Sequence, residues 1–86
     1  MKILAISHNR ADPTTHIKEE LRRVAELREA GILDELWLKA DRSGAVIVLE
    51  ADDADDAQRQ LATLPLVAHG ITTFEVTELV AVDSAR

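Results

Sequence analysis

Three histidines, His8, His16 and His69, are the residues of this 86-residue chain best suited to move a proton near neutral pH. His8 begins a short polar segment that continues with Asn9 and Arg10 after an apolar run. A histidine can take a proton from a carbon next to a carbonyl, and an amide can donate to the enolate oxygen that forms. An arginine can hold a carboxylate through two hydrogen bonds. These residue types suit proton transfer in a small carboxylated carbonyl compound, provided that the fold brings them together.

Six segments with regular hydrophobic patterns surround these residues. The predicted elements are a strand over residues 2–7, a helix over 13–30, strands over 32–40 and 45–49, a helix over 54–64 and a strand over 71–82. Asp12-Pro13 is a favourable start for the first helix, and Gly31 is suited to end it. Pro65 is expected to end the second helix. The β-α-β-β-α-β order predicts an α+β, ferredoxin-like single domain over residues 1–82, with a frayed tail at 83–86.

The strand order follows from the connections. Right-handed crossovers leave room for one strand between each parallel pair, which gives an antiparallel four-stranded sheet in the order 4-1-3-2. The two runs that are apolar on both faces, Ile3–Ile6 and Ala45–Leu49, take the central places. Both helices then cover one face, and the other face exposes more apolar surface than monomers usually tolerate. We therefore predict a homodimer through the open sheet face, a dimeric α/β barrel that can assemble further.

One end of this sheet collects the residues that could carry chemistry. The first strand ends there, the hairpin turns there at Asp41–Gly44, and the last strand begins there. Since the first and last strands are antiparallel neighbours, we expect His8 and His69 to lie close together and to act as base and acid. The candidates for substrate binding are Asn9, Arg10, Ser43 and, if its strand turns it inward, Trp37.

Each of these residues also has an ordinary structural interpretation. The histidines can all be solvated, and His16, in the first helical turn, can be a surface residue. Arg10 can pair with a nearby carboxylate, and Trp37 can pack at a dimer interface. A metal site at His8 and His69 would need a third ligand at a suitable spacing, and the sequence offers no evident one. No metal and no cofactor is therefore expected.

Composition excludes several classes of partner. The net charge of −6 argues against nucleic acid and anionic membranes, which call for basic patches. Trp37 and Phe74 are the only aromatic residues, so stacking on nucleic-acid bases is not expected.

Ile3–Ile6 is too short an apolar run for a signal peptide or a membrane span. The chain has no cysteine, which fits the reducing cytoplasm, and we expect a cytoplasmic protein with a small-molecule ligand.

Four pieces of the sequence resemble the muconolactone isomerase-like proteins of the dimeric α/β-barrel superfamily. They are Leu36-Trp37, Leu61-Ala62-Thr63-Leu64-Pro65-Leu66, Glu75-Val76-Thr77 and Leu79. The resemblance covers roughly residues 31–79 and includes the order of the elements. It implies the ferredoxin-like fold, the dimer and a cofactor-independent isomerase that shifts a proton in a small carboxylated lactone or keto compound. The matching residues are mostly architectural, so the resemblance assigns no catalytic residue.

Two other functions are compatible with the same fold, because one fold hosts unrelated chemistries. The first is a non-catalytic dimer that binds a small ligand or assists an enzyme of the same pathway, which the low aromatic content favours. The second is cofactor-free oxygenase chemistry on aromatic polyketides. That chemistry needs more aromatic pocket residues than Trp37 and Phe74, so it ranks last.

Overall fold

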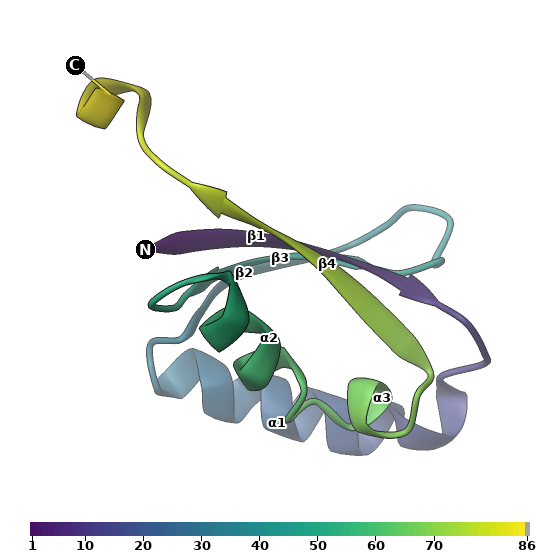
Figure 1. Cartoon of the computed structure of the whole chain (residues 1–86). Helices are drawn as coiled ribbons and strands as arrows, with labels where there is room; N and C mark the ends of the chain where they lie inside the picture. The colour runs from purple at the N-terminus through teal and green to yellow at the C-terminus, as the bar shows by residue number, and fades with distance from the viewer. Residues whose placement is uncertain (86) are drawn as a thin grey trace.

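The computed structural model describes residues 1–85 and contains the predicted elements in the predicted order, with one extra short helix (Figure 1). The strands are β1 (Lys2–Asn9), β2 (Leu33–Leu38), β3 (Ala45–Glu50) and β4 (Thr72–Leu79). The helices are α1 (Ile17–Glu29), α2 (Ala54–Leu61) and α3 (Pro65–Ala68), with 3₁₀ helices at Thr14–His16 and Val82–Ala85. Residue 86, the end of the predicted frayed tail, lies outside the described residues.

The four strands form one antiparallel sheet in the order β2-β3-β1-β4, which confirms the predicted order 4-1-3-2. The two central strands are in register, with Ile3 opposite Leu49 and Ala5 opposite Ile47. All three helices lie on the same side of the sheet (Figure 1). The ferredoxin-like α+β fold is therefore confirmed, and residues 1–85 leave the other face of the sheet uncovered.

The first helix begins later than the sequence predicts. The Asp12 carboxylate accepts hydrogen bonds from the backbone nitrogen and the hydroxyl of Thr14, so Asp12 starts the helical segment as expected. The first turn is a 3₁₀ helix, however, and the α-helix starts at Ile17. At the other end Gly31 has a φ of +76°, the conformation in which glycine ends a helix.

The second helical segment is divided in two by Pro65, which corrects the prediction of one helix over residues 54–64. α2 ends at Leu61. Leu64 is extended, with φ −71° and ψ 131°, which is the conformation favoured before a proline. Pro65 then occupies the first position of α3, where its missing N–H costs nothing. At the start of α2, the Asp53 carboxylate accepts a hydrogen bond from the Asp56 nitrogen at 2.8 Å, so the acidic cluster caps a helix.

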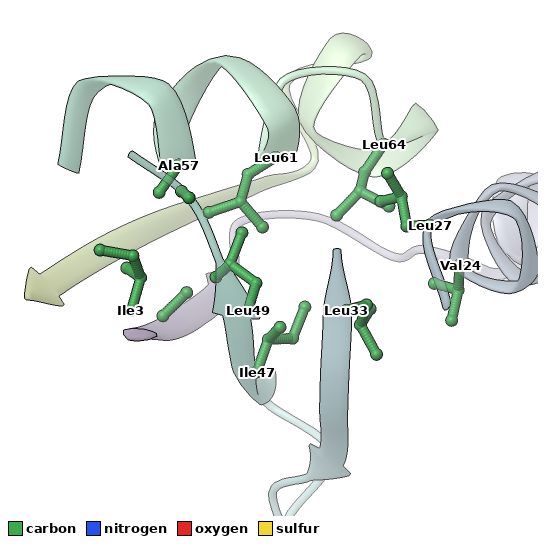
Figure 2. Close-up of a cluster of buried hydrophobic side chains, with 11 residues drawn as sticks. Ile3, Val24, Leu27, Leu33, Ile47, Leu49, Ala57, Leu61 and Leu64 are labelled. Atoms are coloured by element: carbon green, nitrogen blue, oxygen red, sulfur yellow. The ribbon is translucent and has the colours of Figure 1, made fainter. Parts of the chain in front are cut away.

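The hydrophobic core lies between the helices and the covered face of the sheet (Figure 2). In Figure 2 the sheet side chains of Ile3, Ile47 and Leu49 point toward those of the helical layer. The largest fully buried side chains are Ile3, Leu49, Leu61 and Leu64. In the part of the chain that the structure describes, no helix combines the length and the apolar character needed to cross a membrane.

The uncovered face has an apolar centre and a charged end. Successive strand residues point to opposite faces, so the neighbours of the buried residues lie on this side. Its centre holds Leu4, Val46 and Val48, which are half-buried, and Ile6 and Trp37, which are 41% and 64% exposed. At one end of the face, the Lys2 ammonium pairs with the carboxylates of Asp34 and Glu50.

Candidate functional site

A cavity of about 380 Å³ lies between the covered face of the sheet and helices α1 and α3. Most of its lining is apolar, and this part comprises Pro13, Ile17, Leu21, Val24, Leu36, Leu38, Gly44, Ala45, Ile47, Leu66 and Phe74. The polar side chains of the lining are Ser7, Asn9, Glu20, Arg42 and Thr72. An apolar space with a few converging polar groups is the usual form of a small-molecule site.

The cavity opens between α1 and the β2–β3 hairpin. Leu21 on α1 and Leu38 at the end of β2 both line it, and they are 58% and 60% exposed. Ile17 and Arg42 are the other lining residues with large exposed side chains. A ligand can therefore enter past an apolar rim that carries one guanidinium group.

Glu20 provides the ionisable group of the cavity wall. It is half-buried in α1, and its Oε1 accepts a hydrogen bond from the backbone nitrogen of Leu66 at 3.0 Å. Burial raises the pKa of the Glu20 carboxyl, and the hydrogen bond from Leu66 opposes that rise only in part. A carboxyl with a raised pKa in the wall of a mostly apolar cavity can both take and return a proton.

Asn9 is the uncharged polar side chain of the described wall that remains available to a ligand. The neighbouring Ser7 hydroxyl accepts a hydrogen bond from the Ala45 nitrogen at 2.8 Å, and the Thr72 hydroxyl donates to the His8 carbonyl at 3.1 Å. Both hydroxyls therefore have structural partners. Among residues 1–85, the side-chain amide of Asn9 has no hydrogen-bond partner. It can donate to an oxygen of a bound molecule.

The hairpin turn is held against the end of β1, and this contact positions Arg42. The Ser43 carbonyl accepts a hydrogen bond from the Asn9 nitrogen at 2.7 Å, and Asp41 accepts one from the Ser43 nitrogen at 2.9 Å. At Gly44 an added Cβ would lie 2.0 Å from the Ser7 carbonyl oxygen, so only glycine fits there. Arg42 itself has a φ of 63°, an uncommon conformation for a residue with a side chain.

Comparison of the sequence with models of protein families gives a family match. The family model of muconolactone delta-isomerase matches residues 6–84. The chain belongs to this family. A search of curated proteins found no match.

A solved structure supports the fold assignment. It is 5-chloro-2-hydroxyhydroquinone dehydrochlorinase (TftG) from Burkholderia phenoliruptrix AC1100, in complex with 2,5-dihydroxybenzoquinone. It aligns over 98% of each chain with a TM-score of 0.66 and 18% sequence identity. At this identity the likeness establishes the shared fold of this muconolactone delta-isomerase family member and nothing finer.

The structure separates the two histidines that the sequence suggested as a pair. His8 follows Ser7 on β1, and since Ser7 faces the helices, strand alternation places His8 on the open face, opposite Thr73. His69 follows α3 on the helix side, and its ring stacks on that of His16 with 4.0 Å between the centroids. The observed histidine pair is therefore His16 with His69. Neither His8 nor His69 is among the described residues that line the cavity.

The other predicted site residues are divided between the two faces. Asn9 lines the cavity, and Ser43 is half-buried in the turn next to it. Arg10 is exposed in the loop after β1, and the carboxylate nearest in sequence, Asp12, bonds Thr14 instead. Trp37 lies opposite Val46 on the open face, with its indole nitrogen 3.2 Å from a Glu35 carboxylate oxygen.

The two charged residues of the cavity lining, Glu20 and Arg42, were not among the sequence candidates. Glu20 had a signal, because it lies three residues after Ile17 and four before Val24, on the apolar stripe of its helix. A carboxyl at such a position must enter the core or the wall of a cavity. Arg42 lies in the turn at Asp41–Gly44, which the sequence placed at this end of the sheet, but the direction of its side chain depends on how the turn packs against β1.

Proposed function

We propose that this family member is an isomerase that shifts a proton within a small carboxylated lactone or keto compound, with Glu20 as the group that carries the proton. The observation that supports this most directly is a half-buried carboxyl of raised pKa in the wall of an apolar cavity. Membership of the muconolactone delta-isomerase family supports the same class of reaction.

The proposed reaction moves one proton and one double bond. The Glu20 carboxylate takes a proton from the carbon attached to the far end of a C=C bond conjugated with the substrate carbonyl, and the electron pair of that C–H bond moves into a conjugated enolate. The neutral Glu20 carboxyl then returns the proton to a different carbon of the conjugated system, which restores the carbonyl. No atom is gained or lost, and Glu20 ends ionised as it began.

Two further side chains have roles in the proposal. The Asn9 amide donates a hydrogen bond to the oxygen on which negative charge develops, which lowers the barrier to enolate formation. Arg42 at the cavity mouth holds the substrate carboxylate in an ion pair. The rest of the lining shields the enolate, so that the proton is delivered by the Glu20 carboxyl, which can exchange its own proton with solvent through the cavity mouth.

The size of the cavity favours a substrate with one small ring. About 380 Å³ is at the lower end of the range for small-molecule sites. The structural relative TftG was solved with 2,5-dihydroxybenzoquinone, a small oxygenated ring. A five-membered lactone that bears a short carboxylate chain is of similar size, and muconolactone is the compound to assay first.

We also propose that the protein functions as a homodimer through the open face of the sheet. Leu4, Ile6, Val46, Val48 and Trp37 form a contiguous apolar centre there, which would be unfavourable in contact with water. A second copy presents the same surface, so a two-fold contact covers both at once. The cavity lies on the other side of the sheet and stays open to ligand in such a dimer.

The proposed activity is tested by turnover of muconolactone, with a matched pair of variants. We expect Glu20→Gln to lower kcat by about 10²- to 10⁴-fold, the usual contribution of a positioned acid–base group. Glu29→Gln removes the same charge from the exposed end of the same helix and is expected to turn over like the wild type. Lactone binding without turnover in the wild-type protein would contradict the proposal and favour a non-catalytic binding module.

A further inference from the structure

A second group of polar side chains lies outside the cavity, where α3 meets the N-terminal end of α1 (Figure 1). His16 directly precedes α1, Glu19 lies in its first turn and His69 follows α3. The imidazole rings of the two histidines are stacked, with an interplanar angle of 18°. One nitrogen of each histidine and one carboxylate oxygen of Glu19 all lie within 4.8 Å of one another.

One buried nitrogen atom of this group has no hydrogen-bond partner among the described residues. This atom is Nδ1 of His16. Nearly all buried polar atoms in proteins have a partner, and this unpaired nitrogen belongs to a histidine that lies beside two other potential ligands. Glu19 and His69 are exposed, so an ion can reach the group from solvent.

We propose that His16, Glu19 and His69 bind a divalent transition-metal ion, with Zn²⁺ as the best fit. Two imidazoles and one carboxylate are a usual ligand set for Zn²⁺, with water in the fourth position. Mg²⁺ and Ca²⁺ prefer oxygen ligands alone, so they fit this group poorly.

The ligand atoms are already near the separations that a bound ion requires, but the two imidazole rings must reorient. Tetrahedral Zn²⁺ with ligand distances of about 2.0–2.1 Å places its ligand atoms about 3.4 Å apart. The three atoms already lie within 4.8 Å, and two of the three side chains are exposed and can turn. The stacked rings must tilt so that both nitrogens point at the ion, which breaks the stack between His16 and His69.

A bound ion would join two segments that are far apart in the sequence and that both form walls of the cavity. Glu20 follows Glu19 directly on α1, and its carboxylate already accepts a hydrogen bond from the Leu66 nitrogen of α3. The ion would add a second link between α1 and α3. Its role is to hold these helices together, and this inference does not depend on the proposed isomerase reaction.

The test is a titration of the full-length protein with ZnCl₂, followed by calorimetry and by NMR of the imidazole nitrogens. We expect one Zn²⁺ per chain, a rise in melting temperature, and shifts of the His16 and His69 signals without a shift of His8. MgCl₂ at the same concentration is expected to cause none of these changes. Absence of Zn²⁺ binding, or shifts confined to His8, would overturn the proposal.

Substitutions of the ligands locate the ion. His69→Ala and Glu19→Gln change exposed residues, so both variants are expected to fold, and each is expected to weaken Zn²⁺ binding by more than about 10-fold. His8→Ala removes the histidine of the open face and is expected to bind Zn²⁺ like the wild type. Equal weakening in His8→Ala and His69→Ala, or unchanged binding in His69→Ala, would show that the three residues do not form the site.

Discussion

The two faces of the sheet use alternate residues of the same strands for different purposes. On the helix-covered face, Ile3 and Ala5 of β1 are completely buried, and the same face forms one wall of the cavity. On the open face, Ile6 of the same strand is 41% exposed, and Trp37 of β2 is 64% exposed. The covered face therefore holds the core and the candidate site, and the open face holds the surface that we propose for assembly.

The contrast extends to the ionisable groups. Glu20 faces the covered side, and burial raises the pKa of its carboxyl. Glu50 lies on the open side, where hydrogen bonds from Lys2 and from the N-terminal amine lower the pKa of its carboxyl. A carboxyl with a raised pKa suits proton transfer, whereas one held ionised by cations suits a fixed surface charge. Environment, not residue type, distinguishes the two glutamates.

The largest expected effect is on the free energy of unfolding, and it distinguishes two isoleucines of β1. Ile3→Ala is expected to lower the free energy of unfolding by about 2–5 kcal/mol, because it leaves a cavity in the core. Ile6→Ala removes the same atoms from the open face and is expected to act only through assembly, so its effect disappears at low protein concentration. Urea denaturation at several protein concentrations measures both. If Ile3→Ala and Ile6→Ala lose the same free energy of unfolding at low protein concentration, the proposed difference between the two faces is wrong.

A smaller effect is expected on association. Ile6→Lys places a charge in the apolar centre of the open face and is expected to weaken the dimer by about 2 kcal/mol or more. Ala25→Lys adds the same charge to the exposed side of α1 and is expected to leave association unchanged. Sedimentation equilibrium of the wild type and both variants gives the result. A wild-type protein that stays monomeric at high concentration would contradict the proposed interface.

The smallest expected effect is on the pH dependence of stability, which should have opposite signs for Glu20 and Glu50. Because the folded state raises the pKa of Glu20, its contribution to stability is present at low pH and is lost as the pH rises through the raised value. The lowered pKa of Glu50 gives the opposite dependence, with stability present above its ordinary pKa and lost as the pH falls through the lowered value. Glu20→Gln should therefore gain stability relative to the wild type as pH rises, and Glu50→Gln should lose it.

Denaturation curves recorded between pH 3 and pH 8 (about the range in which glutamates titrate in proteins) measure these differences. Glu29→Gln, on the exposed end of α1, serves as the control for the loss of one charge. The same sign for Glu20→Gln and Glu50→Gln would contradict the assignment of different environments to the two carboxyls.

The fold could be predicted from the sequence because hydrophobic periodicity determines it. The right-handed connections predict the central strands, and the runs Ile3–Ile6 and Ala45–Leu49, which are apolar on both faces, identify the same two strands independently. The division of the second helix at Pro65 was missed, because a proline after an extended residue can begin a helix as well as end one. Local sequence does not decide between these outcomes.

The candidate site could be predicted only in part, because the residues that line it depend on which face of the sheet each side chain points to. Of the predicted substrate-binding residues, Asn9 lines the cavity, at the end of the sheet where the sequence placed it. His8 was expected beside His69, but a shift of one residue along β1 changes the face, and His8 follows the buried Ser7. The pairing of His69 with His16 depends on α3, whose existence the sequence did not indicate.

The most direct test of the proposed role of Glu20 is the exchange of substrate hydrogen with solvent. Muconolactone is incubated with the protein in D₂O, and deuterium incorporation next to the carbonyl is followed by NMR. We expect incorporation with the wild type and with Glu29→Gln, and a rate lower by about 10²-fold or more with Glu20→Gln. Incorporation at the wild-type rate in Glu20→Gln would contradict the account.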